Sequence, residues 1–385
     1  MIRTFPLAAL VGVLSCMFSA GAAVAADAKE HQPPLFEEQT LFKSGVGGYA
    51  IYRIPSLVVT NQGTILSLCE ARKNNSGDWG DIDLALRRSV DGGRTWSQIQ
   101  IIADDGGNTM GNPCPVVDRS TGTIWLPFTT GSAPGRGNEQ VLLIKSTDDG
   151  QSWSKPVNIS KMAKDPAWPM VGTGPGHGIQ LKSGRLLIPC WADSTGNSGE
   201  IQTSYCFYSD DHGTTWKRGQ PLTRNASDEC DVVELVDGRV YLNARSRGMR
   251  QRAYAFSKDG GQSWSEVKYD PNQPELECDG ALIRLTDTSG FEKNRILVAC
   301  PANPKARDHM TIRLSYDECG SWPVAKVLNP GYSGYSDLAI ANNHTILCLY
   351  ETDGCSKVTL ARFNLEWLTD VKDSVRARMK RARMK

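Results

Sequence analysis

The chain has 385 residues, with 43 lysines and arginines against 42 aspartates and glutamates, a formal net charge of +1. This balance argues against general binding to nucleic acid or to membrane surfaces, because both need an excess of positive charge. The five histidines lack the spacing of metal ligands, so no metal site is predicted. The 11 cysteines contain no C-x-x-C pair, and several lie in apolar segments where a thiol acts as a small hydrophobe; no disulfide pairing is predicted.

The first 25 residues are expected to be a signal peptide. Arg3 supplies a positive start, Leu7 to Ala26 is apolar and rich in small residues, and Ala23-Val24-Ala25 fits an A-x-A cleavage site. A membrane anchor is the alternative, but the segment lacks a charged stop, so no stable membrane span is predicted. Val13-Leu14-Ser15-Cys16 distantly resembles a lipoprotein cleavage site, which leaves lipidation as a minor alternative. The sequence thus predicts an exported protein, periplasmic or extracellular.

An octapeptide of the form S-x-D-x-G-x-x-W, called the Asp box below, recurs at intervals of about 50 to 60 residues. Asp and Ser bend the chain by accepting backbone hydrogen bonds, Gly permits positive φ, and Trp covers apolar surface under the turn. Each box therefore predicts the tip of a β-hairpin. Calcium binding is the alternative, but each turn offers few acidic ligands. The boxes begin at Ser89, Ser146, Ser209, Ser257 and, with Cys319 in place of the glycine, Ser315.

Short apolar segments rich in branched residues run between the boxes, too closely spaced for intervening helices. A strand, a turn, a second strand and an Asp box make a four-stranded antiparallel unit, and about 350 residues hold about six such units. The predicted fold is all-β, a six-bladed β-propeller with Asp-box hairpin turns over residues 26–370. The segments are Ile65–Leu68, Val141–Ile144, Arg185–Pro189, Val240–Leu242 and Ile296–Val298.

The C-terminal segment 371–385 carries seven basic residues against one aspartate and contains the sequence RARMK twice. We expect a solvated and partly disordered end, because a run of like charges repels itself. Binding to a polyanion or to a membrane is the alternative, although no other part of the chain supports it.

Several motifs outside the Asp boxes resemble, in their order, those of the sialidases, also called neuraminidases, in their bacterial and animal exo-acting form. The resemblance runs from about Gly48 to Leu360 and covers nearly the whole mature chain. It implies the propeller fold and an activity on sialic acids. The motifs are Tyr52-Arg53-Ile54-Pro55, Cys69-Glu70-Ala71-Arg72, Gly174-Pro175-Gly176-His177-Gly178, Asp228-Glu229-Cys230, Leu242-Asn243-Ala244-Arg245-Ser246, Gly334-Tyr335-Ser336-Asp337-Leu338 and Leu349-Tyr350-Glu351.

The resemblance implies that Arg53, Arg245 and Arg307 bind the carboxylate of the substrate. Planar guanidinium groups suit this task because they bind a carboxylate bidentately. Glu351 corresponds to the family's acidic partner of the first arginine. Arg313 lies close to Arg307 in the sequence, which leaves the choice of the third arginine open.

The resemblance also implies that Tyr335 is the nucleophile and that Glu229 accepts its phenolic proton. A free tyrosine has a pKa near 10 and attacks poorly, so it needs a neighbouring base. Most glycosidases use a pair of carboxyl groups instead, and sialidases are an exception in using a tyrosine. A neutral phenol avoids the repulsion that a carboxylate nucleophile would meet at an anionic substrate.

Asp78 corresponds to the general acid, which later activates water as a base. Asp81 and Asp83 are the alternatives, because the alignment of this loop tolerates a shift. Arg72 resembles the family's additional substrate-binding arginine. His177 follows a glycine-rich turn, where it either lines the rim of the site or is a structural turn residue.

The sequence thus predicts an exo-α-sialidase that retains the anomeric configuration and needs no cofactor. Its partners would be sialylated glycans, glycoproteins or glycolipids, with no nucleic acid, while the oligomeric state stays open. Two alternatives remain, a trans-sialidase and a non-catalytic propeller that binds sialoglycans.

Overall fold

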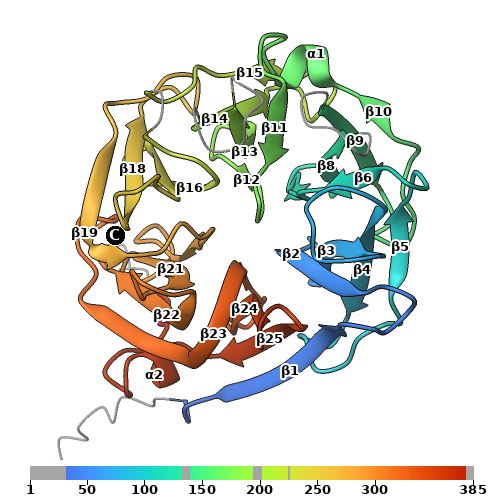
Figure 1. Ribbon diagram of the computed structural model, residues 1–385. Coiled ribbons are helices and arrows are strands. Elements are labelled where there is room, and N and C mark those ends of the chain that lie inside the picture. Colours follow the sequence, from blue (N-terminus) through green and yellow to red (C-terminus); the bar gives the residue numbers. More distant parts are fainter. Residues whose placement is uncertain (1–31, 132–138, 194–201, 224–225, 379–385) are drawn as a thin grey trace, which may run out of the picture.

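The apolar segments between the Asp boxes form strands, and the protein is all-β. The computed structural model describes residues 32–131, 139–193, 202–223 and 226–378, and its sheets are arranged in a ring (Figure 1). The helices in these ranges are single turns, α1 (Ser160–Ala163) and α2 (Leu365–Leu368). Within the described ranges, no helix has the length and apolar character needed to span a membrane. The predicted signal peptide, residues 1–25, lies outside the described residues.

The first half of the described chain forms a nine-stranded sheet and a five-stranded sheet. The nine-stranded sheet contains β2 (Ile51–Val59), β3 (Ile65–Arg72), β4 (Ile82–Ser89), β5 (Gln100–Ala103), β6 (Thr109–Gly111), β7 (Val116–Val117), β8 (Ile124–Gly131), β9 (Gln140–Ser146) and β10 (Val157–Asn158). The five-stranded sheet contains β11 (Met170–Thr173), β12 (Ile179–Gln180), β13 (Leu186–Asp193), β14 (Gln202–Ser209) and β15 (Lys217–Arg218).

The second half forms a four-stranded and a seven-stranded sheet. The four-stranded sheet contains β16 (Cys230–Glu234), β17 (Val240–Ala244), β18 (Gln251–Ser257) and β19 (Lys268–Pro274). The seven-stranded sheet contains β1 (Phe36–Lys43), β20 (Ala281–Thr286), β21 (Arg295–Pro301), β22 (Asp308–Ser315), β23 (Val324–Ile340), β24 (Ile346–Thr352) and β25 (Lys357–Phe363).

All five apolar segments singled out in the sequence fall on strands, β3, β9, β13, β17 and β21, with Arg185 alone lying one residue before its strand. The all-β class is thereby confirmed. The long strand β23 pairs with β22 through its first part and with β24 through its second, which joins two predicted units into one sheet. Because hydrogen bonds group the described strands into four sheets, the count of six blades stays a prediction.

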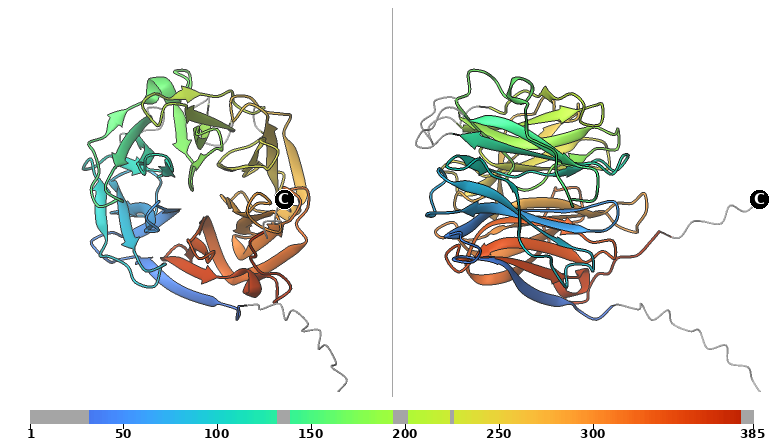
Figure 2. Two further views of the ribbon diagram at one scale, coloured as in Figure 1. Left: turned by 180° about the vertical axis from the view of Figure 1, so that it is seen from behind. Right: turned by 90° about the vertical axis from the view of Figure 1, so that its right-hand side faces the viewer.

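The ring closes through a strand that the sequence patterns did not predict. β1 pairs antiparallel with β25, in a register that runs from Phe36 opposite Phe363 to Lys43 opposite Lys357. In both views of Figure 2 this first strand lies against the last strands of the chain. The closure brings β2 next to β23 and β24, and it thereby places residues from the two ends of the sequence around one centre.

Each Asp box uses its aspartate to satisfy its own turn. In the first box the hydroxyl of Ser89 donates to Asp91 at 2.8 Å, and Asp91 accepts the N–H of Thr95 at 2.9 Å. The N–H of Gly93 donates to Ser89 at 2.9 Å. In the fifth box Cys319 takes the place of this glycine, with φ of +68° and the same N–H bond to the serine at 3.0 Å. The carboxylates of the boxes thus act as hydrogen-bond acceptors within the hairpins, as the structural interpretation of the repeat predicts.

Gly213 of the third box offers a test of this packing. A Cβ atom there would lie 2.2 Å from Cε2 of Trp125, at a φ of +84°. Gly184 has a similar φ of +93° and open space around it. We expect Gly184→Ala to cost about 1 kcal/mol of unfolding free energy, and Gly213→Ala to cost about 1–3 kcal/mol more because of the clash. Thermal and denaturant unfolding of the two variants measure this difference; equal losses would contradict it.

The described part of the C-terminal segment departs from the predicted solvated tail. Asp373 accepts from Arg295 at 2.8 Å, where Arg295 is fully buried. Val375 packs on the cluster that contains Leu365 and Leu368. Residues 371–378 therefore belong to the folded body, because a buried arginine needs its carboxylate partner from this segment. Residues 379–385, which hold most of the predicted positive charge, lie outside the described residues.

Candidate active site

One cavity of about 310 Å³ brings together the side chains that the resemblance singles out. The predicted residues come from β2, from the end of β3 and the loop after it, from the segment before β16, from the loop after β17, from the segment before β22 and from β23, and residues of β6, β8, β11, β13 and β14 complete the lining. Glu351 on β24 lies behind this lining and is fully buried. The predicted residues on the cavity wall are Arg53, Arg72, Asp78, Glu229, Arg245, Arg307 and Tyr335.

Arg53 is held by Glu351. Its Nε lies 3.0 Å from Oε1 and its second terminal nitrogen 3.2 Å from Oε2, a bidentate pair. Glu351 also accepts the backbone N–H groups of Ile54 at 3.0 Å and Tyr335 at 3.1 Å. Burial alone raises the pKa of this carboxyl, but Arg53 and the N–H groups outweigh burial and lower it. Glu351 therefore stays ionised and orients both the arginine and the backbone of Tyr335.

Arg245 and Arg307 lie on the other sides of Tyr335. Arg245 is 2.9 Å from Glu229 and 3.0 Å from the hydroxyl of Tyr335. Arg307 donates to the carbonyl of Glu277 at 2.6 Å, and its Cζ lies 5.4 Å from the centroid of the Tyr335 ring. The Cζ of Arg53 lies 5.3 Å from the same ring. Three guanidinium groups thus surround one phenol.

The structure shows which of the two candidate arginines, Arg307 or Arg313, lines the cavity with Arg53 and Arg245. Arg307 lines the cavity, whereas Arg313 lies outside it on β22, buried, with the Sγ of Cys300 at 3.9 Å from its guanidinium. The two arginines are six residues apart on the same segment, so sequence alone left both open.

Tyr335 and Glu229 form a close, buried pair. The phenolic oxygen lies 2.6 Å and 2.7 Å from the two carboxylate oxygens, so the hydroxyl donates to the carboxylate. Burial, and then the negative charge of Glu229, raise the pKa of the phenol well above 10, while Arg245 and Arg307 lower it. The phenol is therefore neutral, and its proton is donated in a hydrogen bond to the carboxylate of Glu229.

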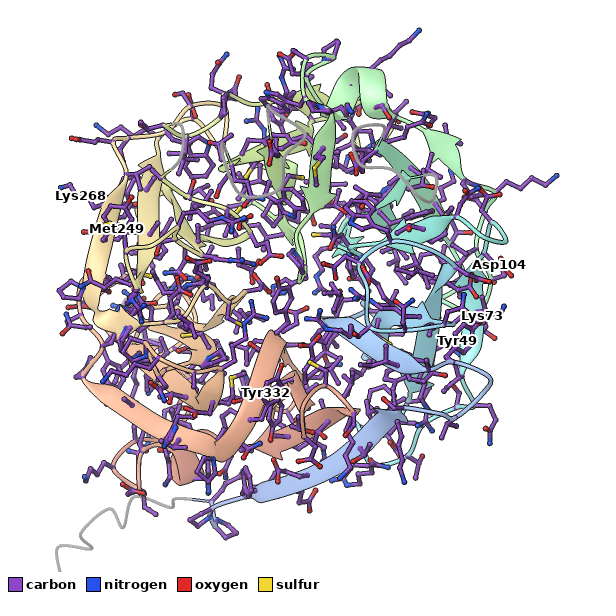
Figure 3. The ribbon with its side chains drawn as sticks, in the orientation of Figure 1. Tyr49, Lys73, Asp104, Met249, Lys268 and Tyr332 are labelled. Carbon is purple, nitrogen blue, oxygen red and sulfur yellow. The ribbon has the colours of Figure 1, made fainter. Side chains whose placement is uncertain are left out.

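Asp78 lies at the mouth of the cavity, with 66% of its side chain exposed. Its carboxylate is 2.8 Å from Arg72 and 3.7 Å from Arg53. The two alternatives lie elsewhere, because Asp81 pairs with Lys73 at 3.9 Å and Asp83 accepts from the hydroxyl of Tyr49 at 2.6 Å. Figure 3 labels Lys73 and Tyr49 on the outer part of the ring, away from its central opening. Of the three aspartates, Asp78 alone lines the cavity.

Several charged residues around the cavity were not singled out from the sequence. Arg72 is held by Glu70 at 2.6 Å, and Glu70 also accepts the N–H of Asn112 at 2.9 Å. Asp228 contacts Arg245 at 3.3 Å and Arg247 at 3.0 Å. Glu70 and Asp228 each stand inside a motif quoted for the resemblance, and that position was the available signal. They pair with arginines of the cavity, whose largely buried charge needs acidic partners.

His177 does not reach the rim. Only 6% of it is exposed, and its Nδ1 lies 2.7 Å from Asp337, so of the two interpretations the structural one fits. Asp231 is close by, and one ligand atom from each of the three residues lies within 4.8 Å of the others. We refer to His177, Asp231 and Asp337 as the His177 cluster.

Comparison with known proteins gives consistent matches. Residues 63–348 match the BNR repeat-like domain family. The chain is 35% identical over 361 residues to a sialidase of Micromonospora viridifaciens, covering 87% of this chain and 55% of that protein. It is 30% identical over 374 residues to Sialidase-2 of Rattus norvegicus, covering 86% of this chain and 96% of the relative. The solved structure of the Hadza microbial sialidase Hz136 matches with a TM-score of 0.79 at 30% identity, covering 86% of this chain and 69% of the other.

The chain thus spans about half the length of the Micromonospora relative, and nearly all of the rat relative. Sialidase neighbours share the ring of antiparallel sheets, which supports the propeller architecture. The order of motifs, the cationic cavity and these matches all indicate the same family. The chain belongs to the sialidase family and contains its BNR repeat-like domain.

Proposed function

We propose that the protein is an exo-α-sialidase, a glycoside hydrolase that releases terminal sialic acids from glycans, glycoproteins or glycolipids with retention of configuration. The observation that carries the proposal is the contact of 2.6 Å between the Tyr335 hydroxyl and Glu229 inside a cavity lined by three arginines. Such a site is suited to bind a sugar that carries a carboxylate and to activate a phenol for attack on that sugar.

The arginines supply recognition. A sialic acid carries its carboxylate on the anomeric carbon, so Arg53, Arg245 and Arg307 would bind the anion next to the reacting centre. Arg53 and Arg245 have only 14% and 13% of their side chains exposed, so their bonds to a carboxylate would be only weakly screened by water. Binding there would place the anomeric carbon over Tyr335.

The first chemical step forms the tyrosyl intermediate. The phenolic oxygen of Tyr335 bonds to the anomeric carbon while its proton passes to Glu229. The glycosidic bond breaks at the same centre, and Asp78 gives its proton to the leaving oxygen. A phenol suits the role because it is neutral before the attack and is not repelled by the carboxylate of the substrate.

The second step reverses these roles. Asp78, now a carboxylate, takes a proton from water, and the water oxygen bonds to the anomeric carbon. The bond to Tyr335 breaks, and its oxygen recovers the proton from Glu229. Two displacements at one carbon retain the anomeric configuration. Tyr335, Glu229, Asp78 and one water molecule supply every proton and nucleophile in this scheme.

Turnover of 4-methylumbelliferyl sialoside, with and without lactose, tests the proposal. Release of free sialic acid in both cases supports hydrolysis. Transfer of most of the sugar to lactose would instead identify a trans-sialidase. Binding of sialoglycans without any release of 4-methylumbelliferone would identify a non-catalytic binding protein.

Arg245→Lys tests the carboxylate-binding role. The lysine keeps the charge but loses the planar fork, so we expect a loss of about 1.5–3 kcal/mol, roughly 10- to 150-fold in kcat/KM. Arg239→Lys is the matched control, since Arg239 is 39% exposed and pairs with Asp237 in an outer turn. Steady-state kinetics on both variants measure the effect. Equal kcat/KM in the two would contradict a role for the Arg245 fork.

A further inference from the structure

The two residues of the nucleophile pair share their backbone segments with two residues of the His177 cluster. Tyr335 and Asp337 lie two positions apart on β23, and Glu229, which directly precedes β16, lies two positions before Asp231 on that strand. Successive side chains of a strand alternate, so residues two apart move together when the strand shifts. Figure 1 shows β16 and β23 approaching the central opening of the ring from different sides. The cluster is therefore placed to set the separation of the two strands.

The contacts of the cluster reach four strands. Nδ1 of His177 lies 2.7 Å from Oδ1 of Asp337, whose Oδ2 accepts the N–H of Leu57 on β2 at 2.6 Å. Oδ2 of Asp231 accepts the N–H of Leu282 on β20 at 2.9 Å. These bonds link the β23 strand to β2, and the β16 strand to β20.

The loop before His177 adds two observations. The carbonyl of Gly176 accepts from the hydroxyl of Ser56 on β2 at 2.8 Å. A Cβ on Gly176 would lie 3.5 Å from Oδ2 of Asp231 and 3.5 Å from Oδ1 of Asp337, so this glycine sits between the two carboxylates. His177 and its loop thus fill the space between β16 and β23.

The charges in the cluster favour a bridged arrangement. Burial lowers the pKa of the His177 imidazole, but Asp337 and then Asp231 outweigh burial and raise it to about 9, while Arg119 lowers it slightly. Burial raises the pKa of Asp231 and outweighs the charge of His177, which lowers it, while the charge of Asp337 raises it further. Buried polar side chains need partners inside the protein. His177 and Asp337 find them in each other and in strand N–H groups, whereas Asp231 accepts the N–H of Leu282 through Oδ2 while its Oδ1, among the described residues, has no hydrogen-bond partner. The chemical steps proposed above use none of the three.

We propose that His177 is a positioning residue for the Tyr335–Glu229 pair, bridging β23 and β16 so that the phenol stays within 2.6 Å of its base. The proposal rests on the proposed sialidase function. A shift of about 1 Å between reacting groups lowers rates by about 10²-fold. A side chain that fixes the distance between the two strands should therefore affect the rate of the reaction. Arg53 is held by Glu351 on β24, outside the cluster, while Arg245 contacts both Glu229 at 2.9 Å and Asp228 at 3.3 Å. Because Arg53 keeps its partner and Arg245 keeps Asp228, loss of His177 should affect turnover more than binding.

A cation is the other occupant that such residues suit, because histidine and carboxylates are ligands of divalent metals. The hydrogen bond of 2.7 Å and the backbone N–H groups of neighbouring strand residues already engage Nδ1 of His177, both oxygens of Asp337 and Oδ2 of Asp231. His177 is hydrogen-bonded to Asp337 and faces Asp231 within 4.8 Å, while Oδ1 of Asp231 has no hydrogen-bond partner among the described residues. Metal analysis of the purified protein separates a bridge made by the imidazole from one made by a cation.

The test compares His177→Ala with His177→Asn. The asparagine puts an amide N–H near the place of Nδ1, so it can still donate to Asp337, whereas alanine cannot. We expect alanine to lower kcat about 10- to 100-fold, with KM and the Kd of the glycal inhibitor of sialic acid within about threefold of wild type. The asparagine variant should recover most of kcat. If the alanine variant does not fold, His177→Gln replaces it, since its amide nitrogen falls near the place of Nε2.

His212→Asn is the matched control. His212 also contacts an aspartate, Asp118 at 2.9 Å, but it lies in an Asp box and is 52% exposed. Its kcat should equal that of wild type. A His177→Ala variant with kcat within threefold of wild type would overturn the proposal. So would a parallel loss of inhibitor binding, or a stoichiometric metal that this variant lacks.

A crystal structure of His177→Ala gives a readout that does not need turnover. We expect the distance from the Tyr335 hydroxyl to Glu229 to grow from 2.6 Å to beyond about 3.5 Å, the limit of a hydrogen bond. An unchanged contact would overturn the positioning role whether or not the wild type is active. An inactive wild type with a lengthened contact would refute the sialidase function alone.

Discussion

Replacement of Tyr335 by phenylalanine is expected to lower kcat on sialosides by about 10³- to 10⁶-fold. The change removes one oxygen and leaves the ring, which lies 5.3 Å and 5.4 Å from the Cζ atoms of Arg53 and Arg307. Carboxylate binding should therefore persist, and the inhibitor Kd should change little. Glu229 keeps its bond to Arg245 at 2.9 Å, so the site is not left with an unpaired buried charge.

Steady-state kinetics and mass spectrometry measure this effect. A 2,3-difluorinated sialic acid should label the wild type on a peptide containing Tyr335 and leave Tyr335→Phe unlabelled. Tyr269→Phe serves as the control, because the hydroxyl of Tyr269 donates to the carbonyl of Ala226 outside the cavity. More than a tenth of wild-type kcat in Tyr335→Phe would exclude the tyrosine as nucleophile.

Asp78→Asn should give a loss that depends on the leaving group. On sialyllactose, whose leaving oxygen needs a proton, we expect kcat/KM to fall by about 10²- to 10⁴-fold. On 4-methylumbelliferyl sialoside the leaving group departs without full protonation, and the fall in kcat/KM should be much smaller. Asparagine keeps the shape of the side chain at the mouth of the cavity, so a steric cause is removed.

Asp81→Asn is the control for this variant. Asp81 lies three positions further along the same loop but pairs with Lys73 at 3.9 Å. Its activity on both substrates should match that of wild type. If Asp81→Asn showed the leaving-group dependence and Asp78→Asn did not, the assignment of the acid would be wrong.

Some residues of the candidate site can be identified from sequence motifs, and others can be identified only from their position in the structure. Tyr335, Glu229, Arg53 and Arg245 stand in short motifs specific enough to single them out, and the structure brings all four into one cavity. Arg307 and Asp78 each had a neighbour of the same type a few residues away. Sequence spacing cannot separate such neighbours, because the direction in which a loop residue points depends on what the loop packs against.

The His177 cluster shows the same limit in another form. The motif around His177 is visible in the sequence, but its role could not be chosen, because Asp231 and Asp337 are distant in the chain. Similarly, the pattern of residues 36–43 does not predict that this strand pairs with β25 and closes the ring. The basic composition of the C-terminal segment likewise predicts a solvated end and does not indicate that Asp373 accepts a hydrogen bond from Arg295.

By itself, the sequence determined the hairpins, the strands and the family. An Asp box makes the hydrogen bonds of its own turn, and a strand can be predicted from the pattern of neighbouring residues. Tertiary structure alone decided how the residues of the site meet. Tyr335 meets a base 106 positions away and Arg53 meets a carboxylate 298 positions away, contacts that exist only once the ring has closed. Local hydrogen bonds can be read from adjacent residues, whereas a pocket at the centre of a ring depends on how distant strands are brought together.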